Sequence, residues 1–494
     1  MIITDDTPPS PSKNAQPLPG DQNHSDTNPA PPAYTGYQQG QAYPGPVPSG
    51  SGYVPIIDAE PLPEPAGKRF FKAFGVALVI YFLLVVFTGS AIDVGQSHRR
   101  RLHRVDPNVP ATLPEGPPED SPQIPPQIPL PLPVPGEKYG KVIRCASGTA
   151  ERFPSEPFRT VTFELPLSAD VLYIFSRGSL ARGSITFVEE EGAHADRVHV
   201  DVSLLVGPTE PRDATNVCLL ERQEGQTGIG ILTPSMVGQY DPLQFYVTVR
   251  FPRSSEQHLN VSAFETDLPL FSHHISSLDG KIAFKSLNLK STNARIVAES
   301  LYAESANIKT TNGAIQGNFR TSGHLSLVTT NAPIQVYAHL THDNVREEST
   351  ETAMITTNGA ITASVRMSSP DSTGGAFKVS TQTSNGPVHV HFVDSPVDTY
   401  LDFSARTSNA PAGASLHRAY EGSFSLHTTH KAPVLQISEH AEDPSGRARG
   451  RNVTSSRWRS GLEGSVAWGN PPYDQPLGSA SVQSTNSAVT LELQ

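Results

Sequence analysis

The sequence predicts an all-β protein whose C-terminal half is a β-solenoid, a stack of coils similar to a parallel β-helix. Three observations support this prediction: a corner motif recurs at the spacing of one coil, apolar and polar residues alternate between the corners, and helical periodicity is absent from most of the chain after residue 92. The motif is Thr/Ser-Thr/Ser-Asn, then a small residue, and in most copies a branched apolar residue two positions later. It occupies residues 291–296, 310–315, 329–334, 356–361, 383–388, 407–412 and 484–489, and a degenerate copy, TTHKAPV, begins at Thr428.

The spacing of the motif fits a solenoid in which each coil contains two strands and two corners. The corner asparagines are Asn293, Asn312, Asn331, Asn358, Asn385, Asn409 and Asn486. Steps of 19, 19, 27, 27 and 24 residues separate the first six, which is too short for a propeller blade and suits one coil. Leu325, Leu327 and Ile334 illustrate the period-two alternation of a half-buried strand. A second turn signal, such as Ser322-Gly323, lies between successive asparagines and predicts the second corner.

We expect the corner asparagines to have a structural role. Asparagine tolerates positive φ and bonds nearby backbone groups, and a following Gly or Ala avoids a steric clash. In coils stacked at about 4.8 Å, equivalent asparagines can also form hydrogen bonds along the axis, and the Thr and Ser residues can form similar ladders. The alternative is a row of β-hairpins, because Asn-Gly favours type I′ turns. The solenoid is preferred because the period persists where Ala or Ser replaces Gly.

The N-terminal part of the chain predicts a tail, a membrane anchor and a stalk. Residues 1–67 contain fifteen prolines and few large apolar side chains, which is typical of disorder. Residues 73–92 are uncharged and mostly apolar, and twenty such residues span a bilayer of about 30 Å as one helix; a buried core helix is the alternative. Residues 93–136 are basic and then proline-rich, as expected of a polyproline II stalk or, alternatively, of a ligand for an SH3-type domain.

The orientation of the anchor is predicted from the cysteines, because basic residues flank both of its ends. Cys145 and Cys218 both follow the anchor and could form one disulfide in an oxidising compartment, although two free buried thiols are the alternative. We therefore expect the C-terminal domain to lie outside, at the plasma membrane or in the secretory pathway. The sequons at Asn260 and Asn452 would then be possible glycosylation sites.

The domain after the stalk divides into two predicted parts. Residues 140–270 are β-rich without the corner motif, which predicts a sandwich-like or capping region, or the opening coils of the solenoid. Residues 271–494 form the repeat solenoid. In the tail, Pro31, Pro32 and Tyr34 match PPxY, a ligand of WW domains that suits the polyproline II conformation.

The sequence offers few candidates for catalytic residues or metal ligands. Asp394, Asp398 and Asp402 are spaced by four residues, but no aligned acidic residue recurs in the neighbouring coils, and solvated loop charges are the better interpretation. His389 and His391 share a face without a third ligand at a matching spacing. We therefore predict no catalytic residue, no cofactor-binding residue and no metal ligand. The net charge of −11 argues against a nucleic-acid partner.

The repeat resembles a known family. The segments LNLKSTNARI from Leu287, KTTNGAIQG from Lys309 and LVTTNAPIQV from Leu327 are similar to the adhesin-like domain family of unknown function found in bacterial and fungal surface proteins. The resemblance covers roughly residues 264–494 and implies a β-solenoid in a fungal-type single-pass membrane protein, without specifying a ligand. The chain departs from the pattern between residues 438 and 484, where GRARGRNVTSSRWRSG is expected to interrupt the stacking.

These features predict a non-catalytic, adhesin-like solenoid displayed for contact with a surface, wall or matrix. The expected partners are the membrane, a wall or matrix polysaccharide or surface protein, and a WW-domain protein at the tail. One alternative is a wall-associated, carbohydrate-active β-helix enzyme. The other is a membrane scaffold that recruits WW-domain proteins through its PPAY motif.

Overall fold

The computed structural model describes residues 139–147, 158–191, 196–205, 215–235, 242–253, 258–469 and 477–494. The predicted tail, anchor and stalk at residues 1–67, 73–92 and 93–136 lie outside these ranges. Within the described ranges, no helix is long and apolar enough to cross a membrane. The described residues form 27 β-strands, and a 3₁₀ turn lies at Pro370–Ser372. The prediction of an all-β fold is confirmed.

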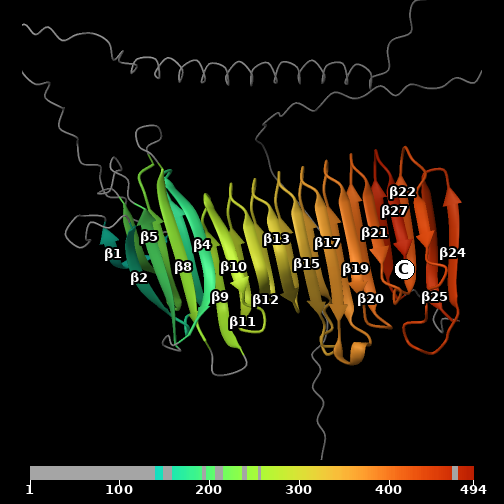
Figure 1. Cartoon of the computed structure of the whole chain (residues 1–494), viewed down its shortest axis with the longest axis horizontal. Helices are drawn as coiled ribbons and strands as arrows, with labels where there is room; N and C mark the ends of the chain where they lie inside the picture. The colour runs from blue at the N-terminus through green and yellow to red at the C-terminus, as the bar shows by residue number, and fades with distance from the viewer. Residues whose placement is uncertain are drawn as a thin grey trace, which may run out of the picture. The chain divides into compact units, whose positions relative to one another are not determined.

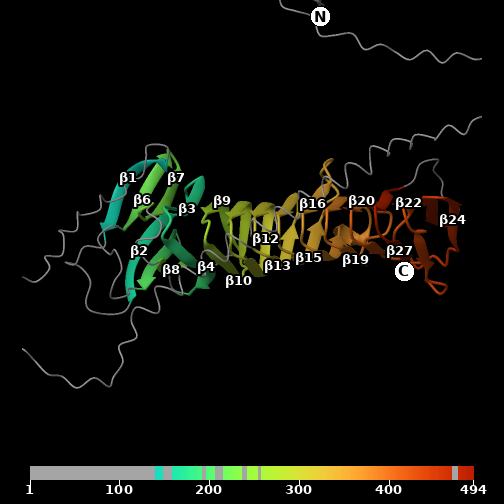
Figure 2. The same cartoon turned by 90° about the horizontal axis from the view of Figure 1, so that it is seen from above.

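The strands stack into two faces that run the length of the domain (Figure 1). The first face contains β10 (Phe271–Ser277), β13 (Ile315–Thr321), β15 (Ile334–Thr341), β17 (Ile361–Ser368), β19 (Val388–Asp394), β21 (Ala412–Leu416), β27 (Val489–Leu493) and β23 (Val434–Ile437). The second face contains β9 (Leu259–Asp267), β11 (Ile282–Lys290), β14 (His324–Val328), β16 (Thr350–Ile355), β18 (Ala376–Gln382), β20 (Tyr400–Thr407), β26 (Ser479–Ser484) and β22 (Gly422–Thr428). The long strand β12 (Ile296–Lys309) passes from the first face to the second. Figure 2 shows the two faces as two layers, with β16 and β20 in one and β15 and β19 in the other.

Neighbouring strands within each face are parallel, as in β13–β15–β17 and β14–β16–β18. Each corner motif therefore joins two different faces instead of closing a hairpin, because the strands on its two sides pair with strands of other coils. The chain follows a solenoid path, and the alternative of a row of hairpins is wrong.

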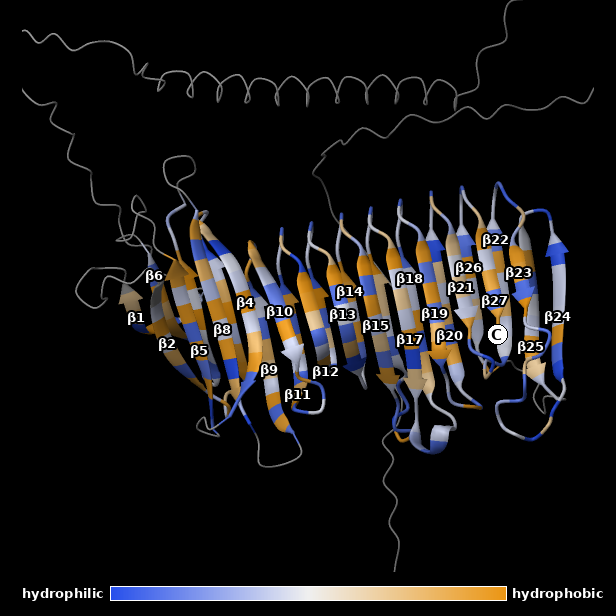
Figure 3. Ribbon diagram, in the orientation of Figure 1, coloured by the Kyte–Doolittle hydropathy of each residue, from blue (hydrophilic) through white to orange (hydrophobic). Residues whose placement is uncertain are grey.

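The core lies between the two faces. In β15, Ile334, Val336, Ala338 and Leu340 point inward and are buried, whereas the residues between them are exposed or half-buried. Figure 3 shows this alternation as orange and blue bands on successive strands. Removing the apolar side chains from water stabilises the stack, at about 25 cal/mol for each Å² buried.

The N-terminal end is a cap in which the same two faces continue with antiparallel pairs. The cap, residues 139–253, contains β1 (Lys141–Ser147), β2 (Phe158–Pro166), β3 (Val171–Arg177), β4 (Ala181–Glu190), β5 (Arg197–Leu205), β6 (Asn216–Gln223), β7 (Gln226–Leu232) and β8 (Leu243–Pro252). Strands β1, β6 and β7 pair antiparallel, as do β2, β5 and β8. Strands β7 and β8 then begin the parallel stack by pairing with β3 and β4, which in turn pair with β9 and β10. No break separates the cap from the coils, because one cluster of buried side chains extends from Phe163 to Leu493.

The C-terminal coils are stacked in an order that differs from their order in the sequence. Strand β26 lies between β20 and β22, and β27 lies between β21 and β23. The C-terminus therefore ends among the coils, while β24 (Arg451–Trp458) forms the far end of the domain (Figure 1). Strand β25 (Gly461–Trp468) pairs antiparallel with both β22 and β24. The expected interruption is therefore displaced to the end of the stack, since residues 479–493 supply the coil that continues it.

Candidate functional site: the corner ladder and an aromatic groove

The corner asparagines form a continuous ladder of side-chain hydrogen bonds along one edge of the stack. In each step the Nδ2 of one asparagine donates to the Oδ1 of the asparagine in the coil before it, at 2.6–2.7 Å. The ladder contains Asn293, Asn312, Asn331, Asn358, Asn385, Asn409 and Asn486, in that order. Every amide points the same way, so the ladder has a donor end and an acceptor end.

The expectation that these asparagines adopt positive φ is wrong. Among the described non-glycine residues, positive φ occurs at Asn344, Asp371, Ser372, Asp398 and Ala448, and none of these is a corner asparagine. The corner turns instead because its backbone bonds to the coil below. The backbone N–H groups of the asparagine and of the residue before it both donate to one carbonyl of the preceding coil, as in the bonds of 2.9 and 3.1 Å to the oxygen of residue 311.

The first hydroxyl residue of each motif is buried and bridges two coils. Thr356 is 3% exposed, its Oγ1 donates to the carbonyl of Ala332 at 3.2 Å, and it accepts the backbone N–H of Gly359 at 3.1 Å. A Cβ at Gly359 would lie 1.9 Å from the same Ala332 oxygen, so glycine is required there by the close approach of the coils. Thr310, Thr329 and Thr383 make the same bonds to their preceding coils. The motif therefore closes each corner with one buried hydroxyl and one exposed amide.

The acidic residues and histidines considered as candidate chemistry are dispersed. Asp394 pairs with Arg366 at 3.1 Å, and Asp402 accepts a hydrogen bond from Ser479 at 3.0 Å. His391 lies 2.7 Å from the side-chain nitrogen of Gln494. Within the described ranges, no three His, Cys, Asp or Glu side chains come together in a way that could hold a metal ion.

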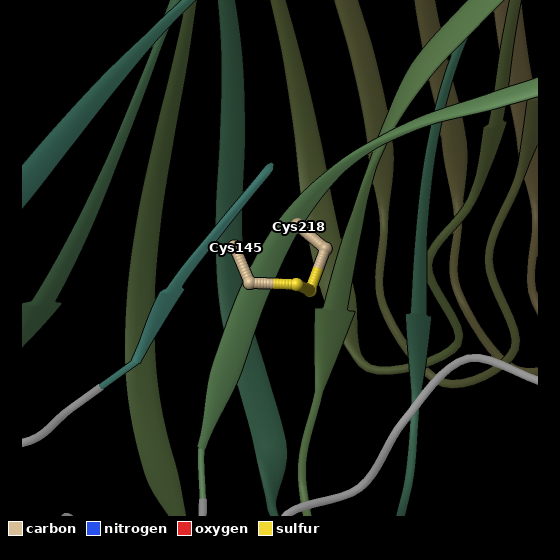
Figure 4. The surroundings of a disulfide bond; sticks show 2 residues. All are labelled: Cys145 and Cys218. Carbon is tan, nitrogen blue, oxygen red and sulfur yellow. A yellow bond between two sulfur atoms is a disulfide. The ribbon is translucent and has the colours of Figure 1, made fainter. Parts of the chain in front are cut away.

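The remaining predicted residues lie in three places. Cys145 of β1 and Cys218 of β6 are joined by a disulfide whose Cα atoms are 4.0 Å apart (Figure 4). The exposed Asn260 and Asn452 lie in β9 and in the end strand β24. The PPAY residues at positions 31–34 are outside the described ranges.

A groove that the sequence did not predict lies on the second face, where the cap meets the coils. Its volume is about 350 Å³, and its walls include side chains of β3, β9 and β11. Tyr173 and Phe175 of β3 form its floor and are almost fully buried. Two glycines of β7 make room for these rings, because a Cβ at Gly228 or Gly230 would lie 2.4 Å or 2.7 Å from a ring carbon.

Arg177 organises one wall of the groove. Its guanidinium lies over the rings of Tyr139 and Phe175, with its Cζ atom 4.8 and 5.0 Å from their centroids. It also donates to Asp267 at 2.7 Å, and Lys290 approaches the other oxygen of that carboxylate at 3.4 Å. Two cations thus hold one carboxylate beside an aromatic stack, an arrangement that combines cation–π and charge-assisted contacts.

Arg222 organises the other wall. Its guanidinium lies 4.8 Å from the ring centroid of Tyr173 and pairs with Glu265 at 3.0 Å. Burial raises the pKa of the Tyr173 hydroxyl to about 12. Its O–H lies 3.4 Å from the backbone carbonyl of Tyr139. Aromatic rings beside fixed charges and hydroxyls suit the recognition of a polar ligand.

The groove escaped sequence analysis because its residues are far apart in the chain. Arg177 and Asp267 are separated by 90 residues, and Arg222 and Glu265 by 43. Only the parallel pairing of β3 with β9, which aligns Tyr173 with Glu265 and Phe175 with Asp267, brings them together.

No protein-family model and no curated protein match this chain. Three solved structures to which it is similar each align with 68% of the chain. One is described as a "putative cell adhesion protein" from Clostridium sporogenes, with 7% identity, 99% of that chain covered and a TM-score of 0.15. The others are each described as a "putative adhesin", from Bacteroides fragilis (9% identity, 97% covered, TM-score 0.27) and from Parabacteroides distasonis (10%, 97%, 0.21). At these identities and TM-scores the likenesses do not indicate a function for this chain.

Proposed function

We propose that this chain displays a rigid, non-catalytic β-solenoid for contact with a surface, wall or matrix. The observation that carries the proposal is the unbroken asparagine ladder, which links every coil from Asn293 to Asn486. Each coil is bonded to the next by backbone, buried hydroxyl and amide, so the stack resists bending. Such a stack suits a protein that holds a binding surface in a fixed position.

The groove is the proposed contact site, and a wall or matrix polysaccharide is the proposed ligand. A polysaccharide offers hydroxyls and ring oxygens that can bond to Arg222, Glu265, Lys290 and Asn288, all of which line the groove. The side chains of Arg222, Glu265 and Lys290 are held by ion pairs and a ring contact before a ligand arrives, so they lose little entropy on binding. A surface protein with a polar loop is the other partner consistent with this lining.

The membrane arrangement belongs to the same proposal. Residues 73–92 would form one membrane-spanning helix, with the solenoid outside and the PPAY motif of residues 31–34 in the cytosol. A disulfide between β1 and β6 supports this orientation, because such bonds persist in oxidising compartments. Protease treatment of sealed, cytosol-out microsomes tests it: the solenoid should be protected and the tail cleaved, and the reverse pattern would contradict the orientation.

Binding is tested with the full chain incubated with insoluble wall polysaccharide. We expect retention of the wild-type chain without release of soluble sugar. Arg222→Ala should reduce retention about tenfold, because it removes a cation held over Tyr173 and leaves Glu265 unpaired.

The matched control is Arg366→Ala. This arginine also forms an ion pair, with Asp394 at 3.1 Å, but it lies on β17 of the other face. Equal loss of retention in both variants would contradict the groove as the contact site. Release of soluble sugar by the wild-type chain would contradict the non-catalytic function.

A further inference from the structure

We propose that the chain exchanges its last coil with a second copy of itself, so that residues 477–494 of one chain complete the stack of another. This segment lies between the coil of β20 and β21 and the coil of β22 and β23. We call the position that it fills the slot. The segment supplies β26 to the second face and β27 to the first face. The proposal is independent of what the groove binds.

One side of the slot holds the segment through the corner chemistry of the repeat. Asn486 donates to Asn409 at 2.7 Å, and the buried Ser484 donates to the carbonyl of Ala410 at 2.9 Å. At the other end of β27, the backbone N–H of Gln494 donates to the carbonyl of Leu416 at 3.1 Å. These bonds fix the register of the segment at both ends.

The other side of the slot is equally well paired. The backbone N–H of Ser423 donates to Gly478 at 3.0 Å, and that of Ser438 donates to Leu493 at 2.9 Å. Thr428 donates its hydroxyl to the carbonyl of Ser487 at 2.8 Å. The segment is therefore bonded on both of its edges, and its apolar side chains, Ala480, Val482, Val489, Leu491 and Leu493, are no more than 2% exposed.

These contacts join the segment to distant parts of the chain. Asn486 and Asn409 are 77 residues apart, and Gly478 and Ser423 are 55 apart. The strand that precedes the segment, β25, pairs with β22 and β24 and not with β26. A segment from a second copy would thus make the same bonds. With the slot empty, β22 would keep only β25 as a partner among the described strands and β23 would have none, so the end of the stack is complete only when the slot is filled.

The corner motif determines which segment fits the slot. Ser484-Thr485-Asn486 continues the asparagine ladder, whereas the degenerate Thr428-Thr429-His430 occupies the outermost coil, beyond the last asparagine. The occupant must therefore carry a hydroxyl–hydroxyl–asparagine corner followed by a strand, as residues 477–494 do. Because the contacts are identical within one chain and between two, the ratio of exchanged to unexchanged chains depends on the chain concentration. A segment on a short tether has an effective concentration of about 1 mM at the slot of its own chain, and a second copy must compete with it. Exchange is expected where chains fold close together.

The test uses two full-length chains with different tags that are folded together. Ser404 of β20 and Ser481 of β26 are half-buried register partners, so cysteines at these positions are close enough to form a disulfide. One chain carries Ser404→Cys and the other carries Ser481→Cys. A disulfide between the two tags can then form in the native register only if the segment of one chain lies in the slot of the other.

The matched control pairs a Ser380→Cys chain with a Ser404→Cys chain. Ser380 and Ser404 are also register partners, but they belong to coils that are consecutive in the sequence. We expect the Ser404/Ser481 mixture to give about tenfold more linked product than the control, and the yield to rise with chain concentration during folding.

Two results would overturn the proposal. The first is equal linkage in the two mixtures, which would show unspecific cysteine pairing. The second is no linkage between tags in the Ser404/Ser481 mixture, while a single chain that carries both substitutions links internally. The internal link also shows that the substituted chain folds with its slot occupied.

Discussion

The cap and the coil stack share one core but are held together in different ways. The cap relies on antiparallel pairs between distant strands, on a disulfide that closes a separation of 73 residues, and on large buried rings such as Phe163, Phe187 and Phe251. The coils rely on a corner repeated along one edge, in which a buried hydroxyl and an exposed amide bond each coil to the one before. Stability in the cap is therefore shared by the whole unit, whereas stability in the coils is a sum of similar steps.

The difference predicts how damage spreads. A change in the cap should lower the stability of the end from which the stack begins, and a change in one corner should loosen mainly its own coil and the two beside it. The following experiments test this contrast.

The largest effect is expected for loss of the disulfide. Replacing Cys145 and Cys218 together with Ala should lower the free energy of unfolding of the cap by about 4 kcal/mol, because a long loop is released in the unfolded chain. Denaturant unfolding combined with hydrogen exchange can measure the cap and the coils separately. A loss of the same size in the most distant coils would contradict the contrast between the two regions.

Acid should destabilise the junction of the cap and the coils through His273. This side chain is fully buried beside Thr266 in the first coil, and burial lowers its pKa from 6.5 to about 4. The unfolded chain protonates this histidine at a higher pH than the folded chain does. The free energy of unfolding is therefore unaffected by His273 above pH 6.5 and falls by about 3 kcal/mol as the pH is lowered to 4.

Unfolding measured across this pH range checks the effect of His273. His273→Gln should remove the part of the slope that this residue causes, whereas His389→Gln, at an exposed position on β19, should leave the slope unchanged. An identical slope in the His273 variant and the wild-type chain would show that the titration of this histidine is not responsible.

A buried corner hydroxyl should contribute about 2 kcal/mol. Thr356→Val keeps the shape of the side chain but leaves the carbonyl of Ala332 and the N–H of Gly359 without this partner. Thr357→Val changes the exposed neighbour and should alter stability by less than about 0.5 kcal/mol. Thermal unfolding of the two variants gives the comparison, and equal losses would mean that burial of the hydroxyl is unimportant.

The smallest effect is expected for a single asparagine. Asn358→Ala removes two exposed ladder bonds and should cost about 1 kcal/mol, whereas Asn293, at the first corner, only accepts one ladder bond, so that Asn293→Ala should cost about half as much. Hydrogen exchange of the flanking amides should report both changes. A loss that spread equally to all coils would show that the ladder acts as one cooperative unit.

The sequence was sufficient to predict the coils but not how they are ordered. The corner motif and the alternation around Leu325 and Ile334 predicted parallel strands with two corners in each coil, because these patterns depend on local geometry and burial. The position of residues 479–493 could not be predicted in this way. Every corner has the same chemistry, so the motif does not encode which coil follows which.

The groove could not be predicted for a related reason. Arg177, Arg222 and Asp267 are ordinary charged residues in the sequence, and only the pairing of β3 with β9 and β7 gives them a common surface. The fully buried His273 likewise stands in the sequence beside a second histidine, His274, which is exposed. Which of the two is buried depends on the pairing that places β10 between β4 and β12.

The two long edges of the stack differ in how much they can change. The corner edge repeats one turn, whereas at the opposite edge the connections between faces range from Ser322-Gly323 to the segments 342–349 and 369–375. A longer connection at that edge leaves the strand register intact and costs only about 0.6 kcal/mol for each doubling of its length. The corner edge thus sets the spacing of the coils. The opposite edge can accept inserted sequence at any chosen coil without changing that spacing.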